Sequence, residues 1–176
     1  VFSRVVPEAL RRLPEAWRRR LHVVQQCRPE DLDGVRRTYG GIGIDAEIAQ
    51  FFADVPERLA EAHLLIGRAG ASTVAEVLVV GRPAILVPYP HAIDDHQSAN
   101  AHAVDAAGGG WLMPEDAFAP ETLSARLESL FELPHTLIKA AAAGHAASLP
   151  DAARRLADAV YGLMPNGESE DRREAA

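Results

Sequence analysis

Cysteine is almost absent from this sequence of 176 residues, in which Cys27 is the only one. A single cysteine cannot form a disulfide within the chain, and a zinc site would have to use histidine and carboxylate ligands instead. Such a composition suits a reducing compartment such as the cytosol. Because Cys27 has no catalytic signature around it, we expect it to be a small residue of the core.

Long apolar runs and an excess of positive charge are also missing. The longest strongly apolar runs, Val77 to Val80 and Ala84 to Val87, are far shorter than the roughly 20 residues that a membrane-spanning helix needs. Lys and Arg number 18 against 25 Asp and Glu, which gives a net charge of -7. Nucleic-acid affinity comes largely from Lys and Arg that neutralise phosphates, so this balance predicts no nucleic-acid partner.

The length and the apolar fraction of 48% predict one globular domain with a real core. We place this domain at residues 1–164. Residues 165–176 are polar and lack apolar periodicity, a pattern that predicts a disordered tail. The chain begins with Val1 rather than Met, and apolar residues recur at helical spacing from Phe2 to Leu13. We therefore expect a piece of a longer protein that begins inside a helix.

Short β-like runs alternate with helical segments, which predicts an α/β fold with a Rossmann-like, doubly wound parallel sheet. After the last strand only helices follow, and the final one, Asp151 to Leu163, has an apolar stripe that needs a surface to pack on. The expected strands are Leu21 to Gln25, Ala46 to Phe52, His63 to Ile66, Ala84 to Tyr89 and Gly110 to Met113.

The first candidate site is the segment Gly67 to Glu76, directly after an expected strand. Its small residues let a ligand approach the backbone, and Ser72 or Thr73 is suited to cap the next helix, whose free N–H groups attract an anion. Glu76 is an acceptor-only carboxylate, suited to the two neighbouring hydroxyls of a ribose. The alternative is a tight turn followed by an exposed glutamate that the helix dipole stabilises.

The second candidate is the polar segment from Pro88 to Asn100, after the next strand. Because parallel strands end at one edge of the sheet, it is expected to face the same crevice as Gly70 to Glu76. Gln97 and Asn100 are suited to sugar hydroxyls, and the alternative is a solvated helix start. The residues His91, Asp94, Asp95 and His96 have metal-binding side chains, but adjacent Asp residues on a loop more often cap a helix, so we predict no metal.

One long stretch of the sequence resembles a known protein family. The run GRAGASTVAEVLVVGRPAILVPYPHAIDDHQSANA, residues 67–101, closely resembles the donor-binding half of the MurG-type glycosyltransferases of family 28. The likeness extends more loosely upstream through Phe51 to Val55 and downstream to Leu163, so it covers nearly the whole chain except the tail. The family's glycine-rich loop, which precedes the position of Val1, and its N-terminal domain are absent from this sequence.

The resemblance implies the C-terminal half of an inverting, metal-independent and cofactor-free hexosyltransferase with the GT-B fold. Such enzymes transfer N-acetylglucosamine (GlcNAc) from UDP-GlcNAc to undecaprenyl-diphospho-muramoyl-pentapeptide, which converts lipid I to lipid II in peptidoglycan biosynthesis for the cell wall, cell shape and cell division. The family's N-terminal domain carries the acceptor site, the proposed general base and the membrane-contacting patch. The enzyme would therefore be a peripheral protein on the cytoplasmic face of the bacterial inner membrane, and this half alone should bind donor weakly and transfer nothing.

The resemblance also implies roles for individual residues. Phe52 would meet the uracil through its backbone, although the family has a smaller aliphatic residue there; Glu76 would bind the ribose hydroxyls, and Gln97 would read the GlcNAc hydroxyls. No catalytic residue is assigned. The full set implied for UDP-GlcNAc is Phe52, Arg68, Gly70, Ala71, Ser72, Thr73, Val74, Ala75, Glu76, Gln97 and Asn100.

Two other functions stay open from the sequence. One is a stand-alone nucleotide-sugar-binding subunit that needs a membrane-bound partner for activity. The other keeps the fold and changes the acceptor to a diacylglycerol or a natural product. In every case the net charge of -7 must coexist with an anionic ligand, so binding has to come from backbone N–H groups and a helix dipole rather than from a basic surface.

Overall fold

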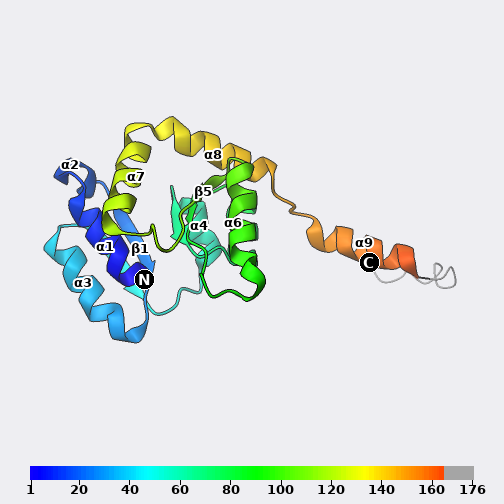
Figure 1. Cartoon of the computed structure of the whole chain (residues 1–176), viewed down its shortest axis with the longest axis horizontal. Coiled ribbons are helices and arrows are strands. Elements are labelled where there is room, and N and C mark those ends of the chain that lie inside the picture. Colours follow the sequence, from blue (N-terminus) through cyan, green and yellow to red (C-terminus); the bar gives the residue numbers. More distant parts are fainter. Residues whose placement is uncertain (165–176) are drawn as a thin grey trace.

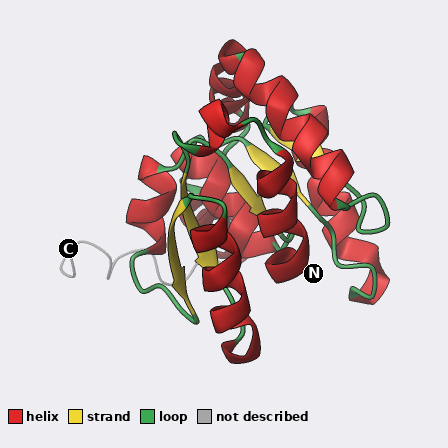
Figure 2. Cartoon of the chain, turned by 90° about the vertical axis from the view of Figure 1, so that its left-hand side faces the viewer, coloured by secondary structure: helices red, strands yellow, loops and turns green. Residues whose placement is uncertain are grey.

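The computed structural model describes residues 1–164. Its elements alternate between short strands and helices, as the sequence predicted, and the strands lie in the interior with helices around them (Figure 2). In chain order they are α1 (Phe2–Arg12), α2 (Glu15–Arg18), β1 (His22–Gln26), η1 (Pro29–Asp31), α3 (Leu32–Gly41), β2 (Asp45–Ala49), α4 (Val55–Glu61), β3 (Leu65–Gly67), α5 (Ala71–Val80), β4 (Ala84–Leu86), η2 (Ile93–Asp95), α6 (His96–Ala106), β5 (Gly110–Leu112), α7 (Pro120–Glu132), α8 (Pro134–Ala146) and α9 (Ala152–Leu163).

All five expected strands are present and every pairing between them is parallel. They form two ladders, β1 with β2 and β3-β4-β5, rather than the single sheet that the sequence predicted. A doubly wound sheet has the order 3-2-1-4-5-6, and the two ladders fit it as strands 2 and 3 and strands 4 to 6. Within residues 1–164, β1 and β3 are not hydrogen-bonded to each other.

Two apolar clusters build the core. In the first, α1 packs against α3 and α7, and its buried residues Val5, Leu10 and Leu13 join Ile85 and Val87 at β4. The second cluster lies where β3 to β5 pack against α5 and α6, and its most deeply buried members are Ala69, Val77, Ala84, Leu86 and Ala101. Side chains of β4 enter both clusters, so this strand is buried on its two faces.

Cys27 follows β1 and is 5% exposed, which confirms the expected core position. Burial raises the pKa of its thiol above the ordinary value. Its Sγ atom accepts a hydrogen bond from Gln25 Nε2 at 3.4 Å. Gln25 Oε1 in turn accepts a hydrogen bond from the Tyr39 hydroxyl at 2.6 Å, so the side chain of Gln25 links β1 to α3.

The end of α5 sets the direction of the chain before β4. Gly81 adopts a left-handed conformation with φ 69° and ψ 47°, which residues other than glycine rarely adopt. The N–H of Arg82 donates to the carbonyl of Val77 at 2.8 Å, and that of Gly81 donates to Leu78 at 3.1 Å. These bonds satisfy the last carbonyls of α5 and turn the chain into β4.

Helix α9 extends away from the other elements (Figure 1), and none of its residues is buried. The predicted apolar stripe is present, with Leu156 67%, Val160 53% and Leu163 87% exposed. The surface that this stripe was expected to need is therefore not supplied by residues 1–164. The predicted tail, residues 165–176, lies outside the described residues. Within the described part, no helix is both long enough and apolar enough to span a membrane.

Candidate nucleotide-sugar site

The loop after β3 leads directly into the N-terminus of α5. Gly70 is the N-cap residue, in an extended conformation with φ -63° and ψ 149°, and its carbonyl accepts the first helical hydrogen bond, from Val74 N at 2.9 Å. Ser72 and Thr73 therefore lie inside the first turn. The expectation that one of them caps the helix is wrong, because the helix begins at Ala71 and no side chain caps it.

An uncapped helix start leaves backbone donors for a ligand. The N–H groups of the first turn, those of Ala71, Ser72 and Thr73, precede the first helical hydrogen bond and have no partner within the helix. Ala71 and Ser72 are exposed, so a ligand can reach this end of α5. The helix has ten residues, and its dipole adds positive potential at the same place. This is the arrangement that binds phosphate groups in many α/β proteins.

Glu76 lies one turn further along α5 and is exposed. With Ala75, Val79 and Val80 it forms one wall of a hollow of about 320 Å³, and the other wall comes from Val55, Pro56 and Leu59 of α4. The hollow is almost entirely apolar apart from this carboxylate. A flat heterocycle and a sugar with neighbouring hydroxyls would match an apolar groove that has one acceptor at its rim.

The structure brings the second candidate segment to the first. Asn100 of α6 donates from Nδ2 to the carbonyl oxygen of Ala69 at 2.9 Å, across 31 positions of the sequence. Gln97, one turn earlier in the same helix, accepts the backbone N–H of Tyr89 through Oε1 at 3.0 Å. Its remaining amide group is a donor, suited to hydroxyl oxygens. The loops after β3 and β4 are thus joined by α6.

Arg68 is placed between these loops, and its guanidinium is engaged with protein groups. Nη1 donates to the carbonyls of Val87 at 3.2 Å and Pro88 at 3.0 Å and lies 2.5 Å from Glu115 Oε2. The guanidinium carbon also lies 5.2 Å from the ring centroids of Phe2 and Tyr89. Arg68 therefore joins the ends of β3 and β4 to the loop after β5. Glu115 was not singled out from the sequence, because an isolated glutamate in a loop carries no signal.

The loop between β4 and α6 has an unusual backbone. Asp94 and Asp95 both have a φ of 51°, in the left-handed region, which Asp tolerates better than most residues. Asp95 Oδ1 accepts the Ser98 hydroxyl at 2.6 Å, and neither Asp side chain caps α6 as the sequence suggested. In the described part of the chain, no three His, Cys, Asp or Glu side chains gather as a metal site would require.

Phe52 lies in the loop 50–54 that follows β2, not in the strand as predicted, and it is 9% exposed. Its ring packs under the guanidinium of Arg58, with 4.2 Å between the Arg58 carbon and the ring centroid. The ring of Phe52 is therefore covered and is not available to a ligand. The neighbouring Phe51 is 74% exposed.

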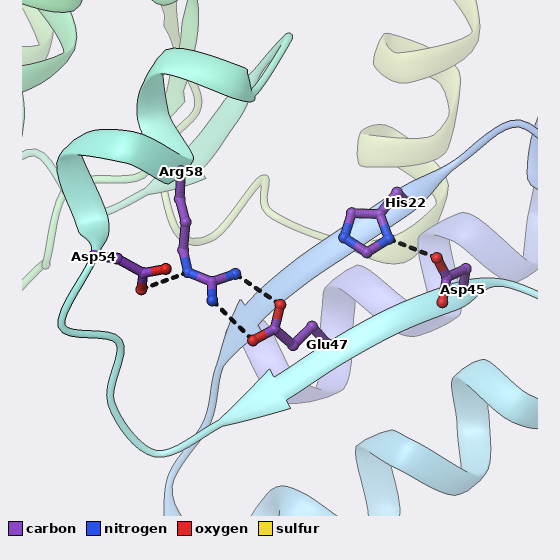
Figure 3. Close-up of polar contacts among 5 residues, drawn as sticks. All are labelled: His22, Asp45, Glu47, Asp54 and Arg58. Atoms are coloured by element: carbon purple, nitrogen blue, oxygen red, sulfur yellow. Dashed lines mark hydrogen bonds and ion pairs between the residues drawn. The ribbon is translucent and has the colours of Figure 1, made fainter.

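Arg58 belongs to a polar cluster that the sequence did not reveal (Figure 3). Its Nε donates to Asp54 Oδ1 at 2.8 Å, and its Nη1 and Nη2 donate to the two carboxylate oxygens of Glu47 at 2.7 and 2.8 Å. These bonds raise the pKa of the Arg58 guanidinium, chiefly through Glu47, and Arg58 lowers the pKa of the Asp54 carboxyl. On the same strand pair, His22 Nδ1 lies 2.7 Å from Asp45 Oδ2. The i, i+4 spacing of Asp54 and Arg58 was the only local signal for this cluster.

Known proteins resemble this chain over most of its length. The protein of Paramagnetospirillum magneticum named UDP-N-acetylglucosamine--N-acetylmuramyl-(pentapeptide) pyrophosphoryl-undecaprenol N-acetylglucosamine transferase is 61% identical over 94% of this chain and 45% of its own length. The protein of the same name from Rhodospirillum centenum is 59% identical over 96% of this chain and 45% of its own length. The chain thus spans about half the length of these relatives.

The fold of this chain also resembles that of a solved structure. The crystal structure of Acinetobacter baumannii MurG superposes with a TM-score of 0.81 at 28% identity, over 92% of this chain and 46% of that one. This likeness supports the Rossmann-like fold of one half of a GT-B enzyme, with the two parallel ladders seen here. The glycosyltransferase family 28 C-terminal domain matches residues 1–156. The chain therefore belongs to glycosyltransferase family 28, of which it carries the C-terminal domain.

Proposed function

We propose that this chain is the donor-binding half of an N-acetylglucosaminyltransferase that takes UDP-GlcNAc and transfers its sugar to lipid-linked muramoyl-pentapeptide. The observation that carries the proposal is the uncapped N-terminus of α5 with Glu76 one turn further on, beside the hollow between α4 and α5. Membership of glycosyltransferase family 28 and the names of the two relatives support the same substrate.

In this proposal each part of UDP-GlcNAc has its own contacts. The diphosphate lies at Gly70 to Thr73, where the N–H groups of the first turn of α5 point toward it. Glu76 accepts hydrogen bonds from the ribose hydroxyls, with Val74 and Ala75 beside it, and the backbone at Phe52 meets the uracil. The amide group of Gln97 donates to the GlcNAc hydroxyls. Arg68 and Asn100 hold the loops around the sugar-phosphate end of the site.

The helix N-terminus would also serve the chemistry. When the bond between GlcNAc and the diphosphate breaks, negative charge grows on the leaving UDP. Backbone N–H groups and a helix dipole that are already oriented toward this charge stabilise it without further reorganisation. A preorganised site of this kind lowers the barrier for departure of UDP, whichever group deprotonates the acceptor.

The acceptor side of the reaction is proposed to lie outside this chain. The relatives are about twice as long as the part that this chain matches, so the segment that precedes the match in them is the candidate for binding the lipid-linked acceptor and for holding the general base. The same segment would bring the enzyme to the cytoplasmic face of the bacterial inner membrane, where peptidoglycan precursors are assembled.

A chimera tests the proposal. In it, this chain replaces the matching part of the Paramagnetospirillum magneticum protein, and transfer of radiolabelled GlcNAc to a lipid-linked muramoyl-pentapeptide is measured. We expect activity, and we expect Glu76→Ala to weaken UDP-GlcNAc binding by about 1 to 3 kcal/mol, the range for losing partners of a ligand hydrogen bond. Glu132→Ala, at an exposed position of α7, is the matched control. A folded chimera that neither binds UDP-GlcNAc nor transfers GlcNAc would refute the proposal.

A further inference from the structure

One side chain, that of Arg58, contacts two residues of the loop 50–54 and one residue of the strand before it. Arg58, in the second turn of α4, forms a two-pronged ion pair with Glu47 in β2, before the loop, and bonds to Asp54 at the end of the loop. Its guanidinium also covers the buried ring of Phe52, in the middle of the loop. Figure 3 shows the chain turning from β2 into α4 beside the contacts of Arg58 with Glu47 and Asp54.

The ion pair of Arg58 with Glu47 is more buried and more constrained in direction than an ordinary surface ion pair. Exposed ion pairs contribute little to stability because they are screened and cost side-chain entropy. Here the Arg58 side chain is only 24% exposed, whereas Glu47 and Asp54 are about half exposed. A planar fork that binds both oxygens of one carboxylate fixes direction as well as distance, which a lysine cannot do.

The position of the cluster relates it to the site. Val55 and Pro56 directly follow the loop and line the hollow opposite Ala75 and Glu76 of α5. A displacement of the loop would therefore move one wall of the hollow and the backbone at Phe52 together. The cluster also carries two carboxylates, and Arg58 neutralises part of this charge close to where an anionic ligand is proposed to bind.

We propose that Arg58 is a positioning residue, which holds the loop 50–54 in the conformation that reads the nucleotide base and so sets the preference for uracil. This inference rests on the proposed function, because it takes the backbone at Phe52 as the base contact. Arg58 itself touches no substrate; it acts through Glu47, Asp54 and Phe52. Its removal should change base selection more than the binding of the sugar or the phosphates.

Binding of UDP and CDP, measured by titration calorimetry on the complete chain and on the chimera, tests this role. The variants are Arg58→Met, which keeps the side-chain stem, Arg58→Lys, which keeps the charge, and Glu47→Gln, which weakens the fork from the other side. Arg19→Met is the matched control, since Arg19 forms an exposed ion pair with Glu15 on α2. Thermal unfolding of each variant verifies the fold.

We expect Arg58→Met to weaken UDP binding about tenfold, as the loss of one or two well-formed hydrogen bonds would, and to reduce the ratio of UDP to CDP affinity. Arg58→Lys should recover little of that ratio, Glu47→Gln should share the defect, and Arg19→Met should behave as the wild type. Folded Arg58 and Glu47 variants with an unchanged UDP-to-CDP ratio would overturn the positioning role alone. A wild-type protein that binds neither nucleotide would overturn the proposed function and this role with it.

Discussion

Asn100 Nδ2 donates a hydrogen bond of 2.9 Å to the carbonyl oxygen of Ala69, which joins α6 to the loop before α5. Ala69 is fully buried, so its carbonyl depends on a protein partner. We expect Asn100→Asp to weaken UDP-GlcNAc binding by about 1 to 3 kcal/mol, because a carboxylate cannot donate to this carbonyl and adds negative charge near the proposed diphosphate position. Titration calorimetry measures the change.

The matched control for this prediction is His102→Ala, at an exposed position of the same helix. It should leave donor binding unchanged. Equal affinities of Asn100→Asp and wild type would show that the loop before α5 keeps its place without α6.

Arg68 makes a second test of the loop arrangement. Because one guanidinium serves two carbonyls and Glu115, Arg68→Lys should not be conservative. We expect this variant to unfold at a lower temperature and to bind UDP-GlcNAc more weakly than the wild type. Glu115→Gln keeps the shape of the partner and should show a smaller effect in both measurements. A lysine variant with wild-type affinity and stability would contradict this reading of Arg68.

The Arg58 cluster predicts a pH dependence. Arg58 lowers the native pKa of the Asp54 carboxyl, chiefly through its hydrogen bond, whereas in the unfolded chain this pKa returns to about 3.9. The resulting stabilisation is present above that pH and is lost as the pH falls through the lower native pKa. In Arg58→Met, Asp54 should titrate at a higher pH than in the wild type, as carbon NMR of its carboxyl can measure.

Arg19→Met is the control for that titration. Arg19 lowers the pKa of Glu15 in the same way, through a side-chain hydrogen bond. Its removal should raise the pKa of Glu15 and leave Asp54 unmoved. If Asp54 titrates identically in the wild type and in Arg58→Met, the ion pair drawn in Figure 3 does not persist in solution.

The sequence predicted the fold better than the details of the site. Strands such as Ala84 to Leu86 are short apolar runs bounded by turn residues, and Gly81 marks the end of α5, so local pattern and chemistry were sufficient. The predicted cap at Ser72 or Thr73 failed because Gly70, two residues before Ser72, is already the N-cap residue of the helix. The Arg58 cluster was out of reach because Glu47 and Arg58 meet across a loop, and pairing between distant charges leaves no periodic signal.

The buried contact between Tyr39 and Gln25 offers a test of the core. Burial raises the pKa of the Tyr39 hydroxyl above its ordinary value, so at neutral pH it is a hydrogen-bond donor to Gln25 Oε1. Tyr39→Phe would leave that oxygen buried without its partner, and we expect a loss of about 1 to 3 kcal/mol in the free energy of unfolding. Urea unfolding measures it.

The double variant Tyr39→Phe with Gln25→Leu supplies the control, because it removes both polar partners together. It should recover part of the lost stability, since the buried Gln25 Oε1, which Tyr39→Phe alone leaves without a donor, is removed as well. The buried pair would not behave as described if the double variant lost more free energy of unfolding than Tyr39→Phe and Gln25→Leu lose together.

Gly109, just before β5, and Gly144 of α8 lie in close contact, which lets α8 pack against the start of β5. A Cβ atom on Gly109 would lie 2.8 Å from the Cα of Gly144, whereas a Cβ on Gly34 in α3 would meet nothing within 4 Å. Gly109→Ala must therefore push two backbones apart, and we expect it to destabilise the protein by about 1 to 3 kcal/mol, as overpacking does. Gly34→Ala should instead stabilise it by about 0.5 to 1 kcal/mol, because alanine favours a helix over glycine. Opposite shifts of the two unfolding midpoints in urea would verify the close approach, and a Gly109→Ala variant as stable as Gly34→Ala would contradict it.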